Sequence, residues 1–193
     1  KQLKGILLSP EYKKILQGIL LDIQQCAKSA PNEATIESRF DTELAILFDK
    51  LFSHLGYTYF PTKEDAIETK RCVSKGRADT SIGALIIEYK HCSVLKNQIK
   101  RESALEQAAD YVESFNAADI IKTVGFVTDG LIGAFITYSE NALRKEKFSK
   151  LTIEMLDRLV QYIIGLGQKA LTVENLIKDF CIVETCGESY GVR

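Results

Sequence analysis

The sequence has few of the residues on which most metal and disulfide sites depend. Only two of its 193 residues are histidines, His54 and His91, which excludes a histidine-rich metal site. Five cysteines are scattered along the chain without a C-x-x-C pair: Cys26, Cys72, Cys92, Cys181 and Cys186. An odd, dispersed set of this kind indicates reduced thiols in a cytoplasm, not a disulfide framework or a zinc site.

Long apolar runs and several well-known motifs are also missing. No run of about 18 apolar residues occurs, so we expect no membrane-spanning helix, and the N-terminus lacks a signal-peptide pattern. The absence of a P-loop, a G-x-G-x-x-G sequence and Asn-Pro-Pro-Tyr argues against an ATP motor or a methyltransferase within this stretch. The absence of G-x-S-x-G argues against a serine hydrolase.

What is present is an ordinary globular composition with one unevenly charged region. The chain is 46% hydrophobic and 26% charged, with a net charge of −1, and its length suits one domain with an appendage. From Lys63 to Arg101, nine lysines and arginines stand against five acidic residues. This local positive excess is what a phosphate-binding surface requires, although a solvated basic face would have the same composition.

The stretch from Gly76 to Lys90 contains the strongest chemical signal. Its apolar run Leu85–Ile87 predicts a buried strand that ends in Glu88-Tyr89-Lys90. Side chains on a strand alternate between faces, so Glu88 and Lys90 are predicted to point one way and Tyr89 the other. If Gly83 marks a hairpin turn, Asp79 on the preceding strand reaches the same spot.

Two carboxylates beside a lysine favour a metal site with hydrolytic chemistry. Buried charges need each other, a metal ion or water, and Mg²⁺ prefers carboxylate oxygens while keeping several waters. A metal-held water near an ammonium group can attack phosphorus. The alternative is a hairpin with a surface Lys–Glu pair.

The flanking segments predict helices and strands around this stretch. We expect helices over 9–28, 35–55, 102–116, 152–165 and 172–180. We expect strands over 57–60, 71–82, 84–92, 123–128 and 131–138. Residues 93–101 are predicted to form a basic loop, and residues 140–150 a basic linker. The later half of the pattern is β-α-β, which indicates an α/β fold with a central sheet flanked by helices.

The segment from Gly76 to Lys90 resembles the catalytic core of the PD-(D/E)xK nuclease superfamily. Asp79, Glu88 and Lys90 match its motif, and Ala78 stands where a proline is often found. Further along, Gln107 and Tyr111 resemble the Q-x-x-x-Y element of type I restriction subunits and RecB-like nucleases. Residues at this spacing share one face of a helix.

The resemblance implies roles for particular residues. Asp79 and Glu88 would bind Mg²⁺ or Mn²⁺, with the carbonyl of Tyr89 as a further ligand. Lys90 would activate the attacking water, and Gln107 would assist. An acid near the start of the helix before the core strands would complete the catalytic set: Glu37 is the first choice and Glu33 the alternative. The expected fold is a restriction-endonuclease-like α/β core, with a central mixed sheet flanked by helices and extra helices at both ends.

The resemblance also implies an organisation and partners. We expect an N-terminal helical extension over 1–31, the nuclease core over 32–139 and a helical connector over 140–193. The whole is similar to the N-terminal endonuclease domain of restriction–modification enzymes fused to an adenine-N6 DNA methyltransferase. DNA and a downstream methyltransferase or specificity domain would be its partners. Two alternatives stay open: a non-catalytic DNA-binding or docking module that keeps the fold, and a DNA repair nuclease or junction resolvase.

Overall fold

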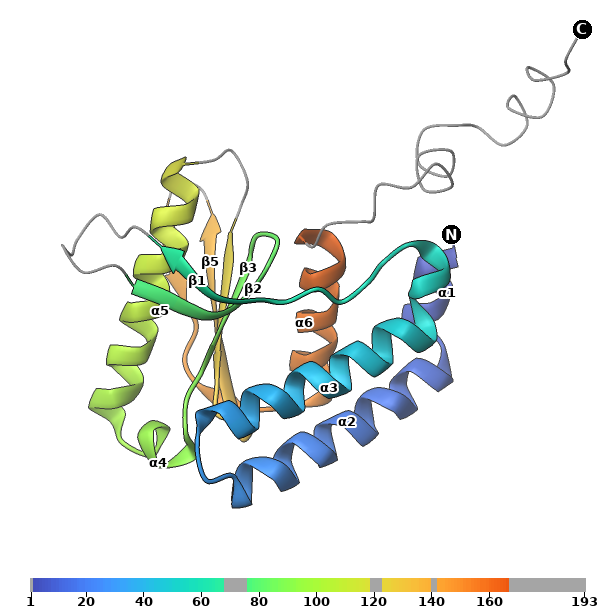
Figure 1. Ribbon diagram of the computed structural model, residues 1–193, viewed down its shortest axis with the longest axis horizontal. Coiled ribbons are helices and arrows are strands. Elements are labelled where there is room, and N and C mark those ends of the chain that lie inside the picture. The colour runs from blue at the N-terminus through green and yellow to red at the C-terminus, as the bar shows by residue number, and fades with distance from the viewer. Residues whose placement is uncertain (1, 68–75, 119–122, 140–141, 167–193) are drawn as a thin grey trace, which may run out of the picture.

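In the computed structural model, which describes residues 2–67, 76–118, 123–139 and 142–166, a mixed β-sheet lies between two helical layers (Figure 1). Its strands are β1 (Thr62–Ile67), β2 (Gly76–Ile82), β3 (Leu85–Tyr89), β4 (Val124–Thr128), β5 (Ile132–Ser139), β6 (Ala142–Lys145) and β7 (Ser149–Lys150). They follow the order β1-β2-β3-β4-β5-β6, and β7 also pairs with β5. Only β3 and β4 are parallel neighbours among these described strands. The predicted α/β class is therefore confirmed.

Helices cover both faces of the sheet. On one face lie α2 (Pro10–Ser29), α3 (Glu33–Leu51) and α6 (Ile153–Leu166), and on the other lie α4 (Cys92–Leu95) and α5 (Gln98–Ala118). The short helix α1 (Gln2–Leu7) precedes α2, and a 3₁₀ turn, η1 (Ser53–Leu55), follows α3. Strand alternation separates the two cores: Ile87 and Tyr89 pack with α3, whereas Ile86 packs with α5.

The helix termini follow the signals expected from the sequence. The side chain of Ser9 accepts a hydrogen bond from the Tyr12 N–H at 3.1 Å, and Pro10 opens α2. Asn32 caps α3 in the same way through the N–H of Thr35. Gly56 ends η1 with a φ of 84°, a left-handed conformation that favours glycine. The helices predicted over 9–28 and 35–55 are thus α2 and α3, the latter beginning at Glu33.

The parallel pair β3–β4 is joined through α5, because parallel neighbours need a crossover connection. α5 packs closely on β4 at Gly125. A Cβ at Gly125 would lie 2.9 Å from Cγ2 of Val112 on α5. Glycine is therefore needed at this position for close approach rather than for backbone conformation.

Two predicted segments, a strand before the central strands and a loop after them, were wrong. Residues 57–60 form no strand. The ring of Tyr59 packs near Phe48, with centroids 6.1 Å apart, so this aromatic residue contributes to the hydrophobic core and not to strand pairing. The predicted basic loop over 93–101 is mostly helical. The side chain of His91 caps α4, and Asn97 accepts hydrogen bonds from the N–H groups of Ile99 and Lys100 at the start of α5.

The predicted linker over 140–150 was also wrong, since β6 and β7 within it pair with β5. Charged residues are common on such edge strands, where they discourage pairing with other chains, and here they resemble a linker in the sequence. The helix predicted over 152–165 is α6. The helix predicted over 172–180 and the strand residues 71–75 lie outside the described residues. Among the residues described, no helix has the length and apolar character needed to span a bilayer.

Candidate active site

Asp79 lies where β2 and β3 separate. The antiparallel register of these strands ends at Thr80 opposite Ile87. One residue further along, Asp79 turns its carboxylate to β3, and Oδ2 accepts a hydrogen bond from the backbone N–H of Tyr89 at 2.8 Å. Alternation along β2 puts Asp79 on the face opposite Thr80, which is the face that Glu88 occupies on β3.

Glu88 and Lys90 form a close ion pair at the end of β3. Nζ of Lys90 donates to Oε1 of Glu88 at 2.6 Å, and the two side chains are 16% and 1% exposed. The other carboxylate oxygen of Glu88, Oε2, is buried and has no hydrogen-bond partner among the described residues. Glu88 and Lys90 thus share a face as the sequence predicted, and one acceptor of Glu88 remains available.

The three charges alter one another's protonation. Burial raises the pKa of Glu88 to about 7, and the Asp79 carboxylate adds to this while Lys90 opposes it. Burial also raises the pKa of Asp79, against the Tyr89 N–H and Lys90, which lower it. Burial lowers the pKa of Lys90, but the carboxylates of Glu88, Asp79 and Glu33 together outweigh it and the result is a raised pKa. Lys90 therefore remains an ammonium ion at neutral pH.

Gln107 and Tyr111 lie on α5 beside this charged group. Nε2 of Gln107 donates to the hydroxyl of Tyr111 at 3.0 Å, as their spacing of four residues allows. Burial raises the pKa of Tyr111, and the Glu88 and Asp79 carboxylates add to this rise, whereas the Gln107 hydrogen bond and Lys90 oppose it. The Q-x-x-x-Y element therefore faces the same site as the three charged residues.

The two acids of α3 occupy different positions. Oε1 of Glu33, the alternative choice, accepts a hydrogen bond from the backbone N–H of His91 at 3.0 Å, directly after Lys90. Glu37, the first choice, is bonded to Lys63 and Thr80 on the face of β2 opposite Asp79. Glu33 contributes to the pKa shifts of Asp79, Glu88 and Lys90, so its carboxylate is the α3 acid that influences all three.

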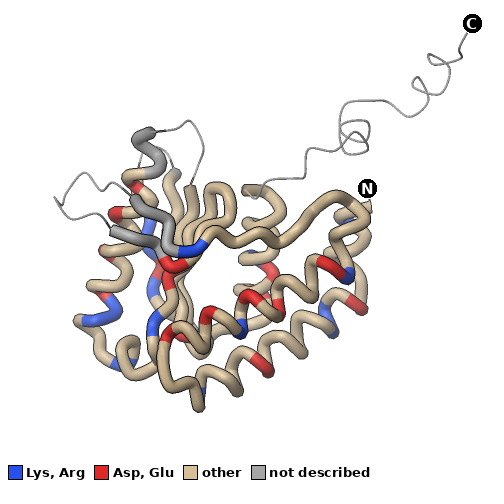
Figure 2. Tube along the Cα trace, viewed as in Figure 1, with Lys and Arg blue, Asp and Glu red and all other residues tan. Residues whose placement is uncertain are grey.

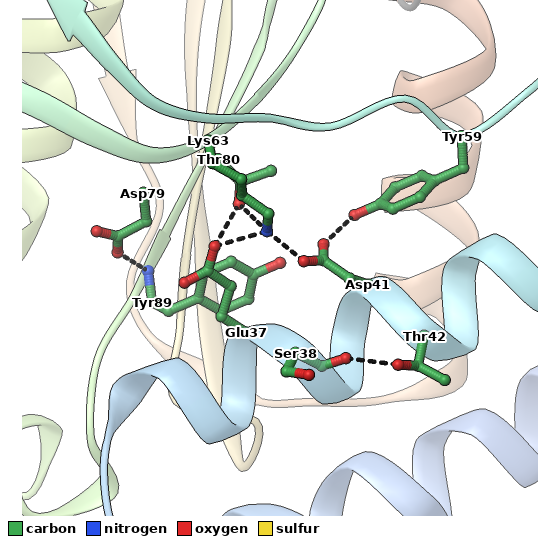
Figure 3. Close-up of polar contacts among 9 residues, drawn as sticks. All are labelled: Glu37, Ser38, Asp41, Thr42, Tyr59, Lys63, Asp79, Thr80 and Tyr89. Atoms are coloured by element: carbon green, nitrogen blue, oxygen red, sulfur yellow. Dashed lines mark hydrogen bonds and ion pairs between the residues drawn. The ribbon is translucent and has the colours of Figure 1, made fainter.

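A second polar group, not expected from the sequence, lies between α3 and the β1–β2 pair. We name it the Lys63 cluster, and it comprises Glu37, Asp41, Tyr59, Lys63 and Thr80 (Figure 3). In Figure 2, basic (blue) and acidic (red) positions lie close to one another where β1 and β2 cross α3. The spacing of Glu37 and Asp41, four residues apart, was the only sequence signal for it.

The donor set at Asp79 and Glu88 suits a hard divalent cation. Mg²⁺ is bound by one or two carboxylates and completes its shell with waters and substrate phosphates. The unpartnered Oε2 of Glu88, with an Asp79 carboxylate near enough to raise the Glu88 pKa, fits this requirement. No three His, Cys, Asp or Glu side chains in the described part of the chain gather closely enough to form a complete metal cage. An ion here would thus depend on water and phosphate oxygens.

Comparison with known proteins adds no relative: no family model, no curated protein and no solved structure matches this chain.

Proposed function

We propose that this chain is a Mg²⁺-dependent DNA endonuclease domain of a restriction–modification enzyme, with a restriction-endonuclease-like core. The observation that carries the proposal is the meeting of Asp79, Glu88 and Lys90 where β2 and β3 separate. Two carboxylates and one ammonium group at a single strand end match the needs of phosphodiester hydrolysis, in which negative charge develops on a phosphate.

In this proposal, Asp79 and Glu88 hold a Mg²⁺ or Mn²⁺ ion, with the carbonyl of Tyr89 as a further ligand. When bound, the ion supplies Lewis-acid stabilisation of the phosphate. Lys90 orients the attacking water and stabilises negative charge on the phosphate oxygens. Gln107 and Tyr111 line the site from α5. In-line attack leaves 5′-phosphate and 3′-hydroxyl ends, and a downstream methyltransferase or specificity domain supplies sequence recognition.

Cleavage of supercoiled plasmid in Mg²⁺ or Mn²⁺ by wild type and Lys90→Ala tests the proposal, with DNA binding followed separately in Ca²⁺. We expect the cleavage rate of Lys90→Ala to be at least about 10²-fold lower, because no other group replaces the Lys90 ammonium in the transition state. Its DNA affinity should fall little, because the counterion-release contribution of the other basic residues remains.

Two outcomes would overturn the proposal. If the wild-type chain binds DNA but never cleaves it, a non-catalytic docking module is the better description. If wild type and Lys90→Ala cleave equally well, the cleavage arises elsewhere and Lys90 has no catalytic role. Lys50→Ala is a matched control, because Lys50 lies on an exposed helix surface, where it forms a 3.6 Å ion pair with Glu11.

A further inference from the structure

We infer that the Lys63 cluster positions the carboxylate of Asp79, so that Lys63, Glu37 and Thr80 are positioning residues of the candidate active site. The inference rests on the proposed function, and it assigns Glu37 a role through Thr80 instead of direct contact with a metal ion. It follows from how β2 is held at Thr80, the residue that adjoins Asp79.

Thr80 is bonded on the α3 side of the sheet. Lys63 lies opposite Thr80 in the β1–β2 register, and Nζ of Lys63 donates to Oγ1 of Thr80 at 3.0 Å. Oγ1 of Thr80 in turn donates to Oε1 of Glu37 at 3.1 Å. Thr80 is fully buried, whereas the Lys63 and Glu37 side chains are 42% and 21% exposed, so these bonds are shielded from water at their Thr80 end.

Lys63 joins this point of the sheet to two successive turns of α3. Its ammonium group lies 2.6 Å from Oε1 of Glu37 and also pairs with Asp41. Asp41 additionally accepts a hydrogen bond from the Tyr59 hydroxyl at 2.6 Å. Burial lowers the pKa of Lys63, but Asp41 and Glu37 outweigh it and raise the pKa. Lys63 is therefore charged at neutral pH, and the segment entering β1 is fixed to α3 at both Tyr59 and Lys63.

Asp79 needs such support because β2 leaves β3 at this position. The β2–β3 register ends at Thr80, whereas β2 continues to pair with β1 as far as Gly76. Figure 3 shows the Asp79 carboxylate on one side of the strand, bonded to the Tyr89 nitrogen, and the Thr80 hydroxyl on the other, within the Lys63 cluster. A shift of β2 relative to α3 would thus move Asp79 away from Glu88.

The Tyr89 amide proton reports this arrangement directly, since it is bonded to Oδ2 of Asp79. Hydrogen exchange at this amide should be measured in the full chain for wild type, Thr80→Val, Lys63→Met and Glu37→Gln. We expect exchange to become about tenfold faster in each variant, the change that follows the loss of one net hydrogen bond. Thr80→Ser, which keeps the hydroxyl, should restore slow exchange, and Lys50→Met should leave it unchanged.

The amide of Phe126, in the buried strand β4, serves as the internal reference for global stability. If the Tyr89 amide exchanges as slowly in the variants as in wild type, the positioning role is wrong. It is equally wrong if the Tyr89 and Phe126 amides accelerate by the same factor, since the Lys63 cluster would then only stabilise the fold. Glu37→Gln is nearly isosteric and keeps the test valid if a more drastic variant fails to fold.

A second readout links the positioning role to catalysis. Thr80→Val should raise the Mg²⁺ concentration needed for half-maximal cleavage and lower kcat, with DNA affinity in Ca²⁺ unchanged, and Thr80→Ser should recover both. Unaltered Mg²⁺ dependence in Thr80→Val would contradict the inference. Failure of the wild-type chain to cleave DNA would instead overturn the proposed nuclease function, while the exchange measurement would still decide whether the Lys63 cluster holds Asp79.

Discussion

Nζ of Lys90 lies 2.6 Å from Oε1 of Glu88, and the other oxygen of this buried carboxylate has no hydrogen-bond partner in the described part of the chain. The ion pair therefore satisfies only half of the Glu88 carboxylate. A buried, half-satisfied carboxylate destabilises the free protein, and either a proton or a cation on Oε2 would relieve the cost. Such a cost at one strand end is typical of a functional site.

The first prediction concerns stability as a function of pH. The pKa of Glu88 is raised from 4.5 to about 7 in the folded chain, so the folded state binds a proton more readily than the unfolded state. The free energy of unfolding contributed by Glu88 is then largest below about pH 4.5 and is lost as the pH rises toward 7. The loss is on the order of 3 kcal/mol at most.

Glu88→Gln removes this titration and tests it. Chemical denaturation of wild type and Glu88→Gln at pH 5 and pH 8 gives the difference in their free energies of unfolding. We expect wild type to lose stability relative to the variant between the two pH values. If the difference in free energy of unfolding is the same at pH 5 and pH 8, Glu88 does not carry the raised pKa. Comparing the two chains cancels the titration of the carboxylates that do not interact with Glu88.

The second prediction concerns the packing of α5 on the sheet. Gly125→Ala puts a Cβ 2.9 Å from the Val112 side chain and should destabilise the chain by about 1–3 kcal/mol. Gly18→Ala is the matched control: Gly18 lies within α2 with open space around it. That substitution should stabilise the chain by about 0.5–1 kcal/mol. Thermal or chemical denaturation measures both, and equal effects of the same sign would contradict the packing of α5 on β4.

The third prediction concerns Gln107 and Tyr111. Tyr111→Phe removes the hydroxyl that accepts a hydrogen bond from the Gln107 side-chain amide. This change should lower kcat for DNA cleavage by about tenfold, since one hydrogen bond beside the reacting group is lost. Gln161→Ala, which breaks an i,i+4 side-chain hydrogen bond with Asp157 on an exposed helix surface, should leave kcat unchanged. If both variants cleave like wild type, the Q-x-x-x-Y element takes no part in catalysis.

The site could be predicted from the sequence where its geometry is local. Asp79, Glu88 and Lys90 lie within one hairpin, so the turn at Gly83 and the alternation of faces along β3 were enough to bring them together. The same holds for the start of α2, where Ser9 and Pro10 act through bonds and backbone angles set within one turn. The β-α-β pattern was also predicted, and the structure adds that β3 and β4, on either side of the helix, are parallel neighbours.

The Lys63 cluster could not be predicted, because it depends on long-range register. Lys63 meets Glu37 across 26 positions of sequence, and its place opposite Thr80 depends on how β1 pairs with β2. The sequence around Lys63 is polar and carries no periodic signal. The strand β6 was missed for a related reason: its edge position tolerates charges that resemble a linker.

Binding of Mn²⁺ is the most direct test of the claim that Asp79 and Glu88 form a metal site. Titration followed by the electron paramagnetic resonance signal of free Mn²⁺ should detect weak binding to the wild-type chain and tighter binding when a DNA duplex supplies phosphate oxygens. Asp79→Ala should abolish this binding, whereas Asp49→Ala, at an exposed position of α3, should preserve it. Equal Mn²⁺ affinity in Asp79→Ala and wild type would contradict the account.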